Sequence, residues 1–325
     1  MKDRLEQATQ FVKNADHLLV VSHLHPDGDA VSSTIATALL LRSLGKEVTM
    51  ANESPIPKKF AFLPEAEQIL QPGQVKQKFR YVVALDCADR ERMGKCRDLF
   101  AEDVRILNLD HHVTNDLYGT VNVVDPDAAA TAEILFEWIQ HLQIPWNPPL
   151  ATLIYTGLLT DTGGFRYSNT SPRVLRQAAQ LMEVGIEAHV IADLVLETTS
   201  MEQLQLLQTA LQTLERSDDG IIAWMSLSLD HLRRCSASSE DLDGIVNYAR
   251  NIIGVDVGIL FRETEEQAVK VSLRSRARVN VGAVAQYFGG GGHARAAGCT
   301  LHGNLEEARS QVISRIQAEL EREGK

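Results

Sequence analysis

The chain has few cysteines and no long apolar run. Its four cysteines, Cys87, Cys96, Cys235 and Cys299, are scattered and form no CxxC pair. This pattern argues against a zinc knuckle or a disulfide framework and indicates reduced thiols. No apolar stretch is long enough to cross a bilayer, and residues 1–7 predict a polar amphipathic helix rather than a signal peptide. We therefore expect a cytoplasmic protein that does not bind a membrane.

An excess of positive charge is also missing. Lysine and arginine number 32 against 43 aspartate and glutamate residues, which leaves a formal net charge of -11 at pH 7. Affinity for long nucleic acid comes mainly from cations that neutralise phosphates, so this balance argues against a broad grip on a long strand. A local basic patch could still hold a short nucleotide, and bound metal ions would cancel part of the acidic charge.

The length of 325 residues predicts two domains, and an apolar content of 44% is sufficient for ordinary hydrophobic cores. In the first half, short apolar runs alternate with helix-length segments. This alternation is typical of a parallel sheet covered by helices on both faces. The expected strands are residues 17–22, 46–51, 81–85 and 104–109, and the expected helices are residues 30–44, 128–142 and 150–160.

The second half predicts a smaller α/β domain. A segment rich in leucine and glutamine, from about residue 187 to residue 216, has a helical pattern and is expected to join the domains. Strands are expected at residues 221–226, 255–261 and 268–273, with helices between and after them, including one from Leu305. The predicted organisation is an N-terminal domain over residues 1–190, a helical linker over residues 191–216 and a C-terminal domain over residues 217–325.

Four motifs that contain acids and histidines lie next to apolar segments. They are His23-Leu24-His25-Pro26-Asp27-Gly28-Asp29, Leu85-Asp86-Cys87-Ala88-Asp89, Leu109-Asp110-His111-His112 and Leu159-Thr160-Asp161-Thr162-Gly163. Ligands of open parallel sheets bind beyond the carboxyl ends of the strands, so the first three motifs should meet at one edge. The end of a helix would deliver the fourth. Crowded carboxylates and imidazoles need a compensating cation, which predicts a site for two metal ions and hydrolysis of phosphate esters.

Each motif also has a purely structural interpretation. Asp27 suits a turn that caps the following helix, and Asp86 could accept a backbone amide. Gly163 could simply end the helix that carries Asp161. The occurrence of all four motifs together favours the metal site, with Asp89 placed behind the ligands or at a cap.

A glycine run near the C-terminus suggests an anion-binding region. The run Gly289-Gly290-Gly291-Gly292-His293 follows the strand segment Ser272-Leu273-Arg274-Ser275-Arg276. Glycine lets backbone amides approach an anion closely, and arginine grips phosphate through two hydrogen bonds. Phe288 could stack on a base. The alternative is a flexible loop beside a solvated charged strand, and the metal motifs favour the first interpretation.

Together these motifs resemble the DHH phosphoesterase family with its DHH-associated C-terminal domain, over nearly the whole chain. The closest resemblance is to its short stand-alone members, the nanoRNases or oligoribonucleases. The resemblance implies one metal ion on His23, Asp27 and Asp86, and a second on Asp29, Asp86, His111 and Asp161. It implies that Asp86 bridges the ions and that His112 faces the scissile phosphate. The substrate-binding residues that it implies are Arg274, Arg276, Gly290, Gly291, Gly292 and His293.

The resemblance also implies the reaction. Short RNA or DNA oligonucleotides and dinucleotides would be hydrolysed to nucleoside 5′-monophosphates, and many relatives also dephosphorylate 3′-phosphoadenosine 5′-phosphate. Manganese is the implied metal, and a mixed set of imidazoles and carboxylates favours it over magnesium, although cobalt, iron and zinc stay open.

Three alternative functions stay open at this point. One is a phosphodiesterase for cyclic di-AMP or pApA. A second is a RecJ-like exonuclease on long single strands, against which the acidic charge counts. A third is a nucleotide sensor without activity, against which the intact metal motifs count. The sequence does not decide the preferred base, the cleavage polarity, the balance of the two activities or whether the chain forms a homodimer.

Overall fold

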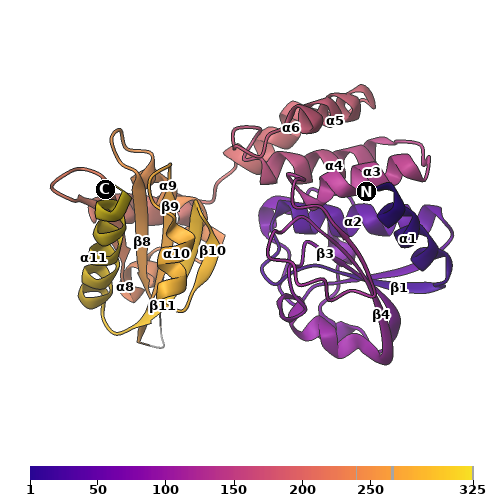
Figure 1. Cartoon of the computed structure of the whole chain (residues 1–325), viewed down its shortest axis with the longest axis horizontal. Helices are drawn as coiled ribbons and strands as arrows, with labels where there is room; N and C mark the ends of the chain where they lie inside the picture. Colours follow the sequence, from indigo (N-terminus) through magenta and orange to yellow (C-terminus); the bar gives the residue numbers. More distant parts are fainter. Residues whose placement is uncertain (239, 265–266, 324–325) are drawn as a thin grey trace. The chain divides into compact units, whose positions relative to one another are not determined.

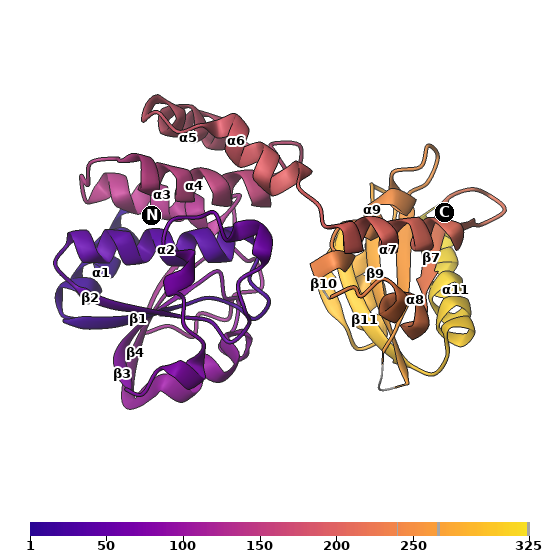
Figure 2. The same cartoon turned by 180° about the vertical axis from the view of Figure 1, so that it is seen from behind.

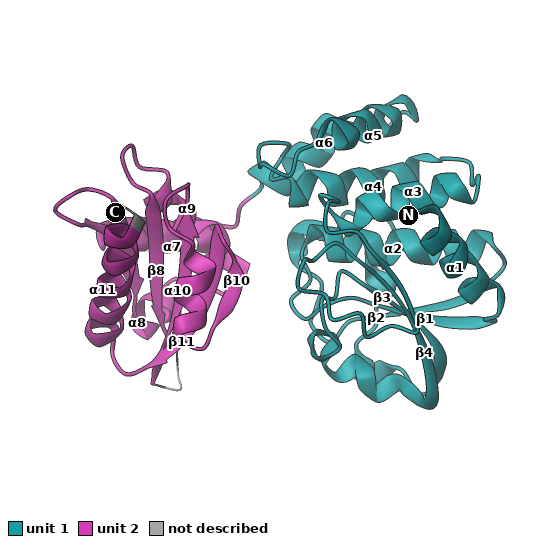
Figure 3. Cartoon of the chain, viewed as in Figure 1, with its two compact units in different colours: residues 1–198 teal, residues 199–325 magenta. Residues whose placement is uncertain are grey.

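The computed structural model describes residues 1–238, 240–264 and 267–323. The chain divides into two compact units, Met1–Thr198 and Thr199–Lys325 (Figure 3). Each unit has its own β-sheet and its own hydrophobic cores. The structure therefore has the expected α/β class, with a parallel sheet in the first unit and a second, mixed sheet in the other.

The first unit is built on a five-stranded sheet with the order β2-β1-β3-β4-β5. Its strands are β1 (His17–Val21), β2 (Glu47–Ala51), β3 (Phe79–Leu85), β4 (Phe100–Asp110) and β5 (Val121–Val124). Every neighbouring pair is parallel. The four predicted strands are present, whereas β5 was not predicted, because its four residues are too short a run to stand out. Since all strands are parallel, their carboxyl ends share one edge.

Alternating side chains of these strands fill two separate cores, one on each face of the sheet. In β1, Leu18 and Val20 join the core under the long helices, whereas Leu19 and Val21 join the core of the opposite face. This division follows from the two-residue period of a strand. Both faces are buried, which explains why the strands appear in the sequence as continuous apolar runs.

Long α-helices cover one face of this sheet, and Figures 1 and 2 show α2, α3 and α4 together on that side. The helices of the unit are α1 (Lys2–Lys13), α2 (Gly28–Ser43), α3 (Thr131–His141), α4 (Pro148–Asp161), α5 (Pro172–Glu183) and α6 (Ala188–Ala192). The opposite face is covered by shorter structure, including the 3₁₀-helical segment Glu91–Leu99, whose buried residues Met93, Cys96 and Leu99 belong to its core.

Two glycines let α2 and α4 pack closely. A Cβ at Gly28 would lie 2.3 Å from the side chain of Thr160, and a Cβ at Gly157 would lie 2.7 Å from the Asp29 carboxylate. Any larger residue would therefore push the two helices apart. This close approach brings the start of α2, with Asp29, next to the end of α4, with Asp161.

The segment expected to be one helical linker is interrupted. After α6 comes a π-helical turn, Asp193–Glu197, and then the extended residue Thr198. Ser200 accepts a hydrogen bond from the amide of Gln203 at 2.9 Å and thereby caps a new helix, α7 (Met201–Gln212). The end of the predicted linker, Glu215–Arg216, is not helical but forms strand β6.

The second unit contains a six-stranded sheet with the order β10-β11-β9-β8-β7-β6. The remaining strands are β7 (Ile222–Leu227), β8 (Val257–Glu263), β9 (Ala268–Ser275), β10 (Gly291–His293) and β11 (Ala296–His302). Only β7 and β8 pair in parallel. The three predicted strands are present, and the last two residues of the glycine run form the short edge strand β10 together with His293 instead of a free loop.

Helices pack on both faces of the second sheet. They are α7, α8 (Leu229–Arg234), α9 (Ile245–Arg250), α10 (Val281–Tyr287) and α11 (Leu305–Glu323). Residues of α10 and α11 share one core, whereas residues of α7 and α9 share the other. No helix among the described residues is long and apolar enough to span a membrane.

Candidate metal centre

The six predicted metal ligands come together at the carboxyl edge of the first sheet. They form overlapping groups whose donor atoms lie within 4.8 Å of one another: His23 with Asp27 and Asp86, and Asp29 with His111 and Asp161. A third group joins Asp86 to His111 and His112. Because Asp86 and His111 each belong to two groups, the donors form one continuous cluster.

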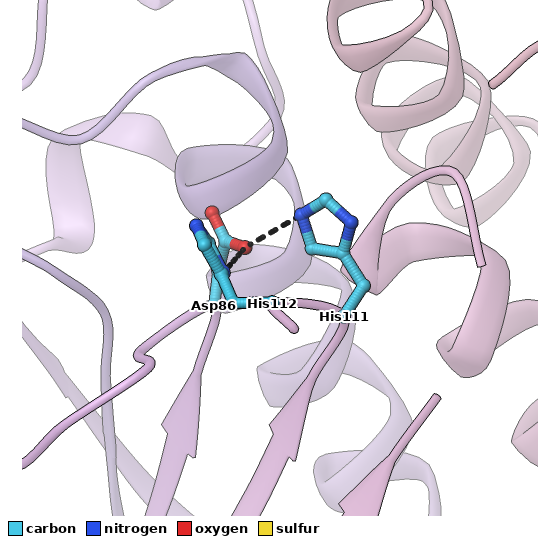
Figure 4. A group of neighbouring side chains, drawn as sticks. All are labelled: Asp86, His111 and His112. Atoms are coloured by element: carbon cyan, nitrogen blue, oxygen red, sulfur yellow. Dashed lines mark ion pairs between the residues drawn. The ribbon is translucent and has the colours of Figure 1, made fainter. Parts of the chain in front are cut away.

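Asp86 lies at the centre of this cluster, as Figure 4 shows for its contacts with His111 and His112. Its Oδ1 is 3.3 Å from His111 Nε2, and its Oδ2 is 3.3 Å from His23 Nε2. The residue directly follows β3, is 2% exposed and has a left-handed backbone with φ of 55°. Its amide donates to Leu109 O at 3.0 Å, which fixes this strained turn to the neighbouring strand. The two carboxylate oxygens therefore face two different imidazoles.

The backbone sets the orientation of both imidazoles. His23 Nδ1 is 2.7 Å from Leu24 O, and His111 Nδ1 is 3.3 Å from Ala128 O. A carbonyl oxygen only accepts, so each Nδ1 carries a proton and each Nε2 points to the carboxylates. Each Nε2 lies 3.3 Å from an oxygen of Asp86, so it either donates a hydrogen bond to that carboxylate or, once deprotonated, could bind a cation together with it.

The pKa values of the carboxyl groups diverge because of crowding. Burial, together with the charge of Asp86, raises the pKa of the fully buried Asp29 to about 7. Burial and the neighbouring carboxylates also raise the pKa of Asp161 well above its usual value. Burial acts in the same direction on Asp86, but hydrogen bonds from His111 and His23 outweigh it and hold its pKa well below the usual range. The cluster thus holds more carboxylates than its own histidines can neutralise, which suits divalent cations.

The pKa values of the two histidines rise in response to this negative charge. Burial lowers both, but the hydrogen bond to Asp86 and the nearby carboxylate charges raise the pKa of His23 to about 9 and that of His111 to about 10. Positive charge is therefore stabilised at the same atoms that would bind a metal.

Asp29 accepts three hydrogen bonds, from its own helix and from the start of α3. It lies in the first turn of α2, and its Oδ1 accepts hydrogen bonds from Ser33 Oγ and from the amide of Ala132, both at 3.0 Å. Its Oδ2 accepts from the amide of Thr131 at 2.6 Å. Asp27, by contrast, is more than half exposed and caps α2 by accepting from the amide of Ala30 at 3.1 Å. Asp27 therefore caps α2, as one interpretation of the sequence predicted, and it also belongs to the donor cluster.

His112 is positioned by a residue to which the sequence assigned no role. Its Nδ1 lies 2.8 Å from Oδ1 of the fully buried Asp110, and Asn115 donates to the other oxygen of Asp110 at 2.6 Å. Nδ1 therefore donates to the carboxylate, and Nε2 is the ring atom left for other contacts. Nothing in the sequence singles out Asn115, which lies in the turn after β4.

Comparison with known proteins agrees with this arrangement. Residues 17–158 match the model described as "DHH family, N-terminal domain", and residues 231–320 match the "DHHA1 domain". A protein of Thermus thermophilus named bifunctional oligoribonuclease and PAP phosphatase NrnA is 36% identical over 94% of this chain and 91% of its own length. The chain belongs to the DHH family.

One further relative and one solved structure are similar to this DHH family chain over almost its whole length. A Bacillus subtilis protein of the same name is 26% identical over 94% of this chain and 94% of its own length. The crystal structure of an exopolyphosphatase-related protein from Bacteroides fragilis is similar with a TM-score of 0.92 and 25% identity, and covers 100% of this chain and 98% of that one.

In this DHH family chain, the first residue of α3 and the loop before it orient ligands that come from three other elements. Thr131 donates through its amide to Asp29 at 2.6 Å and through its hydroxyl to Asp86 at 3.1 Å. Ala128 O accepts from His111. Sequence reasoning missed this loop, because its run of alanines carries no chemical signal.

Glu133 holds this loop in place. It is 1% exposed, accepts from the amide of Ala129 at 2.6 Å and forms an ion pair with Arg173, which also lies 3.5 Å from Asp125. Asn169 donates to the carbonyl of Ala129 at 3.2 Å from the other side. Both backbone groups of Ala129, its N–H and its C=O, are thus hydrogen-bonded to side chains, which fixes the loop.

We expect Glu133→Ala to weaken metal binding by about 10- to 100-fold, because partners that orient ligands have effects of this size. Glu133→Gln should retain part of the affinity, since its amide oxygen can still accept from Ala129. Calorimetric titration with Mn²⁺ measures both. Glu137→Ala, on the same helix, is the matched control. Unchanged affinity in a folded Glu133→Ala variant would contradict the positioning role.

The predicted substrate residues of the DHHA1 domain lie on and beside β9 and β10, and two of them have structural partners. The guanidinium of Arg276 donates to the carbonyls of Arg250 and Asn251 at 3.1 and 3.0 Å, at the end of α9. Arg274 donates to Leu273 O at 3.0 Å. Arg276 therefore stabilises the end of a helix, whatever else it contacts.

The glycine run also has a structural reason. The amides of Gly289 and Gly290 donate to the last turn of α10 at 3.0 and 2.9 Å, so these two amides have partners within the chain. A Cβ at Gly290 would lie 2.2 Å from Gly298 O. Gly292 has φ of 136°, and its Cβ would lie 2.6 Å from a carbonyl of β11. By contrast, Gly291 has open space around it.

Proposed function

We propose that this chain is a divalent-metal-dependent phosphoesterase. Its substrates would be short oligonucleotides, hydrolysed to nucleoside 5′-monophosphates, and 3′-phosphoadenosine 5′-phosphate, hydrolysed to AMP. The observation that carries this proposal is the central carboxylate of Asp86, whose two oxygens face two differently oriented imidazoles. The names of relatives that align over nearly the full chain support the substrate classes.

The donor groups suggest how two cations would be held. His23, Asp27 and Asp86 would bind one, and Asp29, Asp86, His111 and Asp161 would bind the other. The mixed nitrogen and oxygen donors favour Mn²⁺ over Mg²⁺. When bound, such ions polarise phosphoryl oxygens and lower the pKa of a coordinated water to supply a nucleophile.

The chain's own residues contribute orientation and charge. Asp110, itself held by Asn115, keeps the Nδ1–H of His112 engaged, so that Nε2 is the atom that faces a substrate oxygen. With a second proton, on Nε2, His112 would either stabilise charge on the phosphoryl oxygens or pass that proton to the leaving group. We keep Arg274, Arg276, Gly290, Gly291, Gly292 and His293 as the proposed substrate-binding residues.

A substrate panel tests this function. With Mn²⁺, we expect the purified protein to hydrolyse dinucleotides, 5-mers and 3′-phosphoadenosine 5′-phosphate at least about 10-fold faster, by kcat/KM, than long single strands, because the acidic chain lacks the charge for a long contact. Chromatography of the products identifies nucleoside 5′-monophosphates. Hydrolysis of the long strands in preference to the short ones would contradict the proposal.

The same panel separates the alternatives. Preferential hydrolysis of cyclic di-AMP or pApA would indicate a cyclic dinucleotide pathway enzyme. Rapid degradation of long single-stranded DNA would indicate a RecJ-like exonuclease. Absence of Mn²⁺-dependent hydrolysis on every substrate would leave a nucleotide sensor.

We propose the cytoplasm as the compartment. All four cysteines are free and buried, and they lie in hydrophobic cores as reduced thiols do. A homodimer is one candidate for the oligomeric state that the sequence left undecided, and light scattering coupled to size-exclusion chromatography tests it.

A further inference from the structure

Arg92 is anchored beside the metal centre but belongs to none of its donor groups. It lies in the 3₁₀-helical segment Glu91–Leu99, six residues after Asp86. Its amide donates to Asp89 Oδ1 at 3.0 Å, and its carbonyl accepts from the amide of Leu24 at 2.7 Å. Leu24 directly follows the ligand His23. The backbone of Arg92 is therefore tied to the two loops that carry His23 and Asp86.

The guanidinium of Arg92 points to His112. Its Nη1 is 3.5 Å from His112 Nε2, whereas the other ring nitrogen, Nδ1, contacts Asp110. The side chain is partly buried, and no described carboxylate forms an ion pair with it. Other arginines of this unit do pair with acids, such as Arg97 with Glu91 at 2.6 Å. A cation is thus held at the edge of an acidic cluster without an acid of its own.

This placement suits a phosphoryl group. The four aspartates of the cluster repel a phosphate, so a substrate needs positive charge from other residues as well as from bound cations. A guanidinium offers a planar pair of donors that match phosphate oxygens, and it stays charged at any relevant pH. Because Nη1 and Nε2 are 3.5 Å apart, both can reach different oxygens of one tetrahedral phosphate.

We propose that Arg92 is a substrate-contacting catalytic residue, which binds a non-bridging oxygen of the scissile phosphate beside His112. This inference rests on the proposed function for its substrate. It assigns to the first unit a phosphate-binding group that is separate from the arginines predicted in the second unit. The charge that develops on the phosphoryl oxygens during hydrolysis would strengthen the contact.

The test uses the full-length protein with Arg92→Ala, Arg92→Lys and the control Arg90→Ala. Arg90 is two residues away on the same loop, but it is exposed and its guanidinium lies over the Phe100 ring at 5.6 Å. We expect Arg92→Ala to lower kcat/KM for a dinucleotide by about 10²- to 10³-fold, the usual effect of removing one donor to a developing oxyanion. Arg92→Lys should recover only part of the activity, and Arg90→Ala should keep it. Added guanidinium chloride should partly rescue Arg92→Ala but not the alanine variant of His112.

Calorimetric titration of the Mn²⁺-loaded protein with AMP tests the contact without depending on turnover. AMP should bind Arg92→Ala at least about 10-fold more weakly than wild type, whereas Mn²⁺ affinity should be unchanged. Wild-type AMP affinity and turnover in Arg92→Ala would overturn the assignment. A parallel loss of Mn²⁺ affinity would also overturn it, because Arg92 would then act by holding the ligand loops. If the wild-type protein binds AMP more tightly than Arg92→Ala but hydrolyses none of the substrates, only the proposed function is refuted. If the wild-type protein neither binds AMP through Arg92 nor hydrolyses any substrate, both proposals are refuted.

Discussion

Replacing Asp86 with alanine or asparagine is expected to lower turnover of dinucleotides by at least about 10³-fold. Loss of a group that merely orients a ligand costs about 10- to 100-fold in metal affinity or activity, and Asp86 is common to two donor groups. Its oxygens lie 3.3 Å from His23 and from His111, so one substitution removes a donor from both sides of the cluster. Metal content should fall together with activity.

The asparagine variant makes this prediction specific. Asparagine has nearly the same volume and, like aspartate, tolerates the left-handed backbone at this position, where φ is 55°. Asp86→Asn should therefore fold as the wild type does and still lose metal. Asp103→Asn, an exposed residue of β4 that pairs with Arg80, is the control. We would measure bound Mn²⁺ by mass spectrometry, and kcat/KM on the same samples. An Asp86→Asn variant with normal metal content and turnover would refute the bridging role.

Removal of divalent cations is the second large effect. Chelation should abolish turnover and lower the midpoint of thermal unfolding. The ligands come from four separate segments and meet only in the folded chain, so the cation binds the folded state alone. At a concentration 100 times its Kd, a ligand stabilises the folded state by about 2.7 kcal/mol, which corresponds to about 5–10 °C for a unit of this size. Readdition of Mn²⁺ should restore both activity and midpoint.

A single substitution separates metal binding from general stability. In Asp161→Asn, one of the crowded carboxylates at the end of α4 becomes neutral, while its backbone bond to Asn169 remains. Without metal, this variant should unfold at a higher temperature than metal-free wild type. With Mn²⁺, its midpoint should rise less than that of the wild type. Scanning calorimetry measures all four states, and equal midpoints of wild type with and without Mn²⁺ would contradict the proposed metal centre.

The strands and their carboxyl ends could be predicted because both faces of the first sheet are buried. Burial on both faces requires continuous apolar runs, and the acids and histidines that interrupt these runs stand out. For the same reason the candidate ligands Asp86 and His111 could be found from their position directly after β3 and β4. The short strand β5 and the break at Thr198 left no comparable pattern.

The residues that orient the ligands could not be predicted. Thr131 and Glu133 belong to an alanine-rich helix start that looks like ordinary core packing, and Gly157 looks like any helical glycine. Their importance comes from contacts between distant parts of the chain. Thr131 donates to Asp86, which is 45 positions away, and the neighbouring Ala132 donates to Asp29, which is 103 positions away. The structural partners of the glycine run could not be predicted either, since the amides of Gly289 and Gly290 donate to the last turn of α10 and Gly292 pairs with Ala297 of β11.

The sequence by itself determined the fold class, the positions of the strands and the chemical types of the candidate ligands, because hydrophobic period and side-chain chemistry are local properties. Only the tertiary structure decided which oxygen faces which imidazole, which backbone carbonyls set the histidine orientation and which arginine lies beside His112. Those relations depend on the close packing of α2 against α4 and on the parallel alignment of strand ends, and a one-dimensional pattern does not contain such distances.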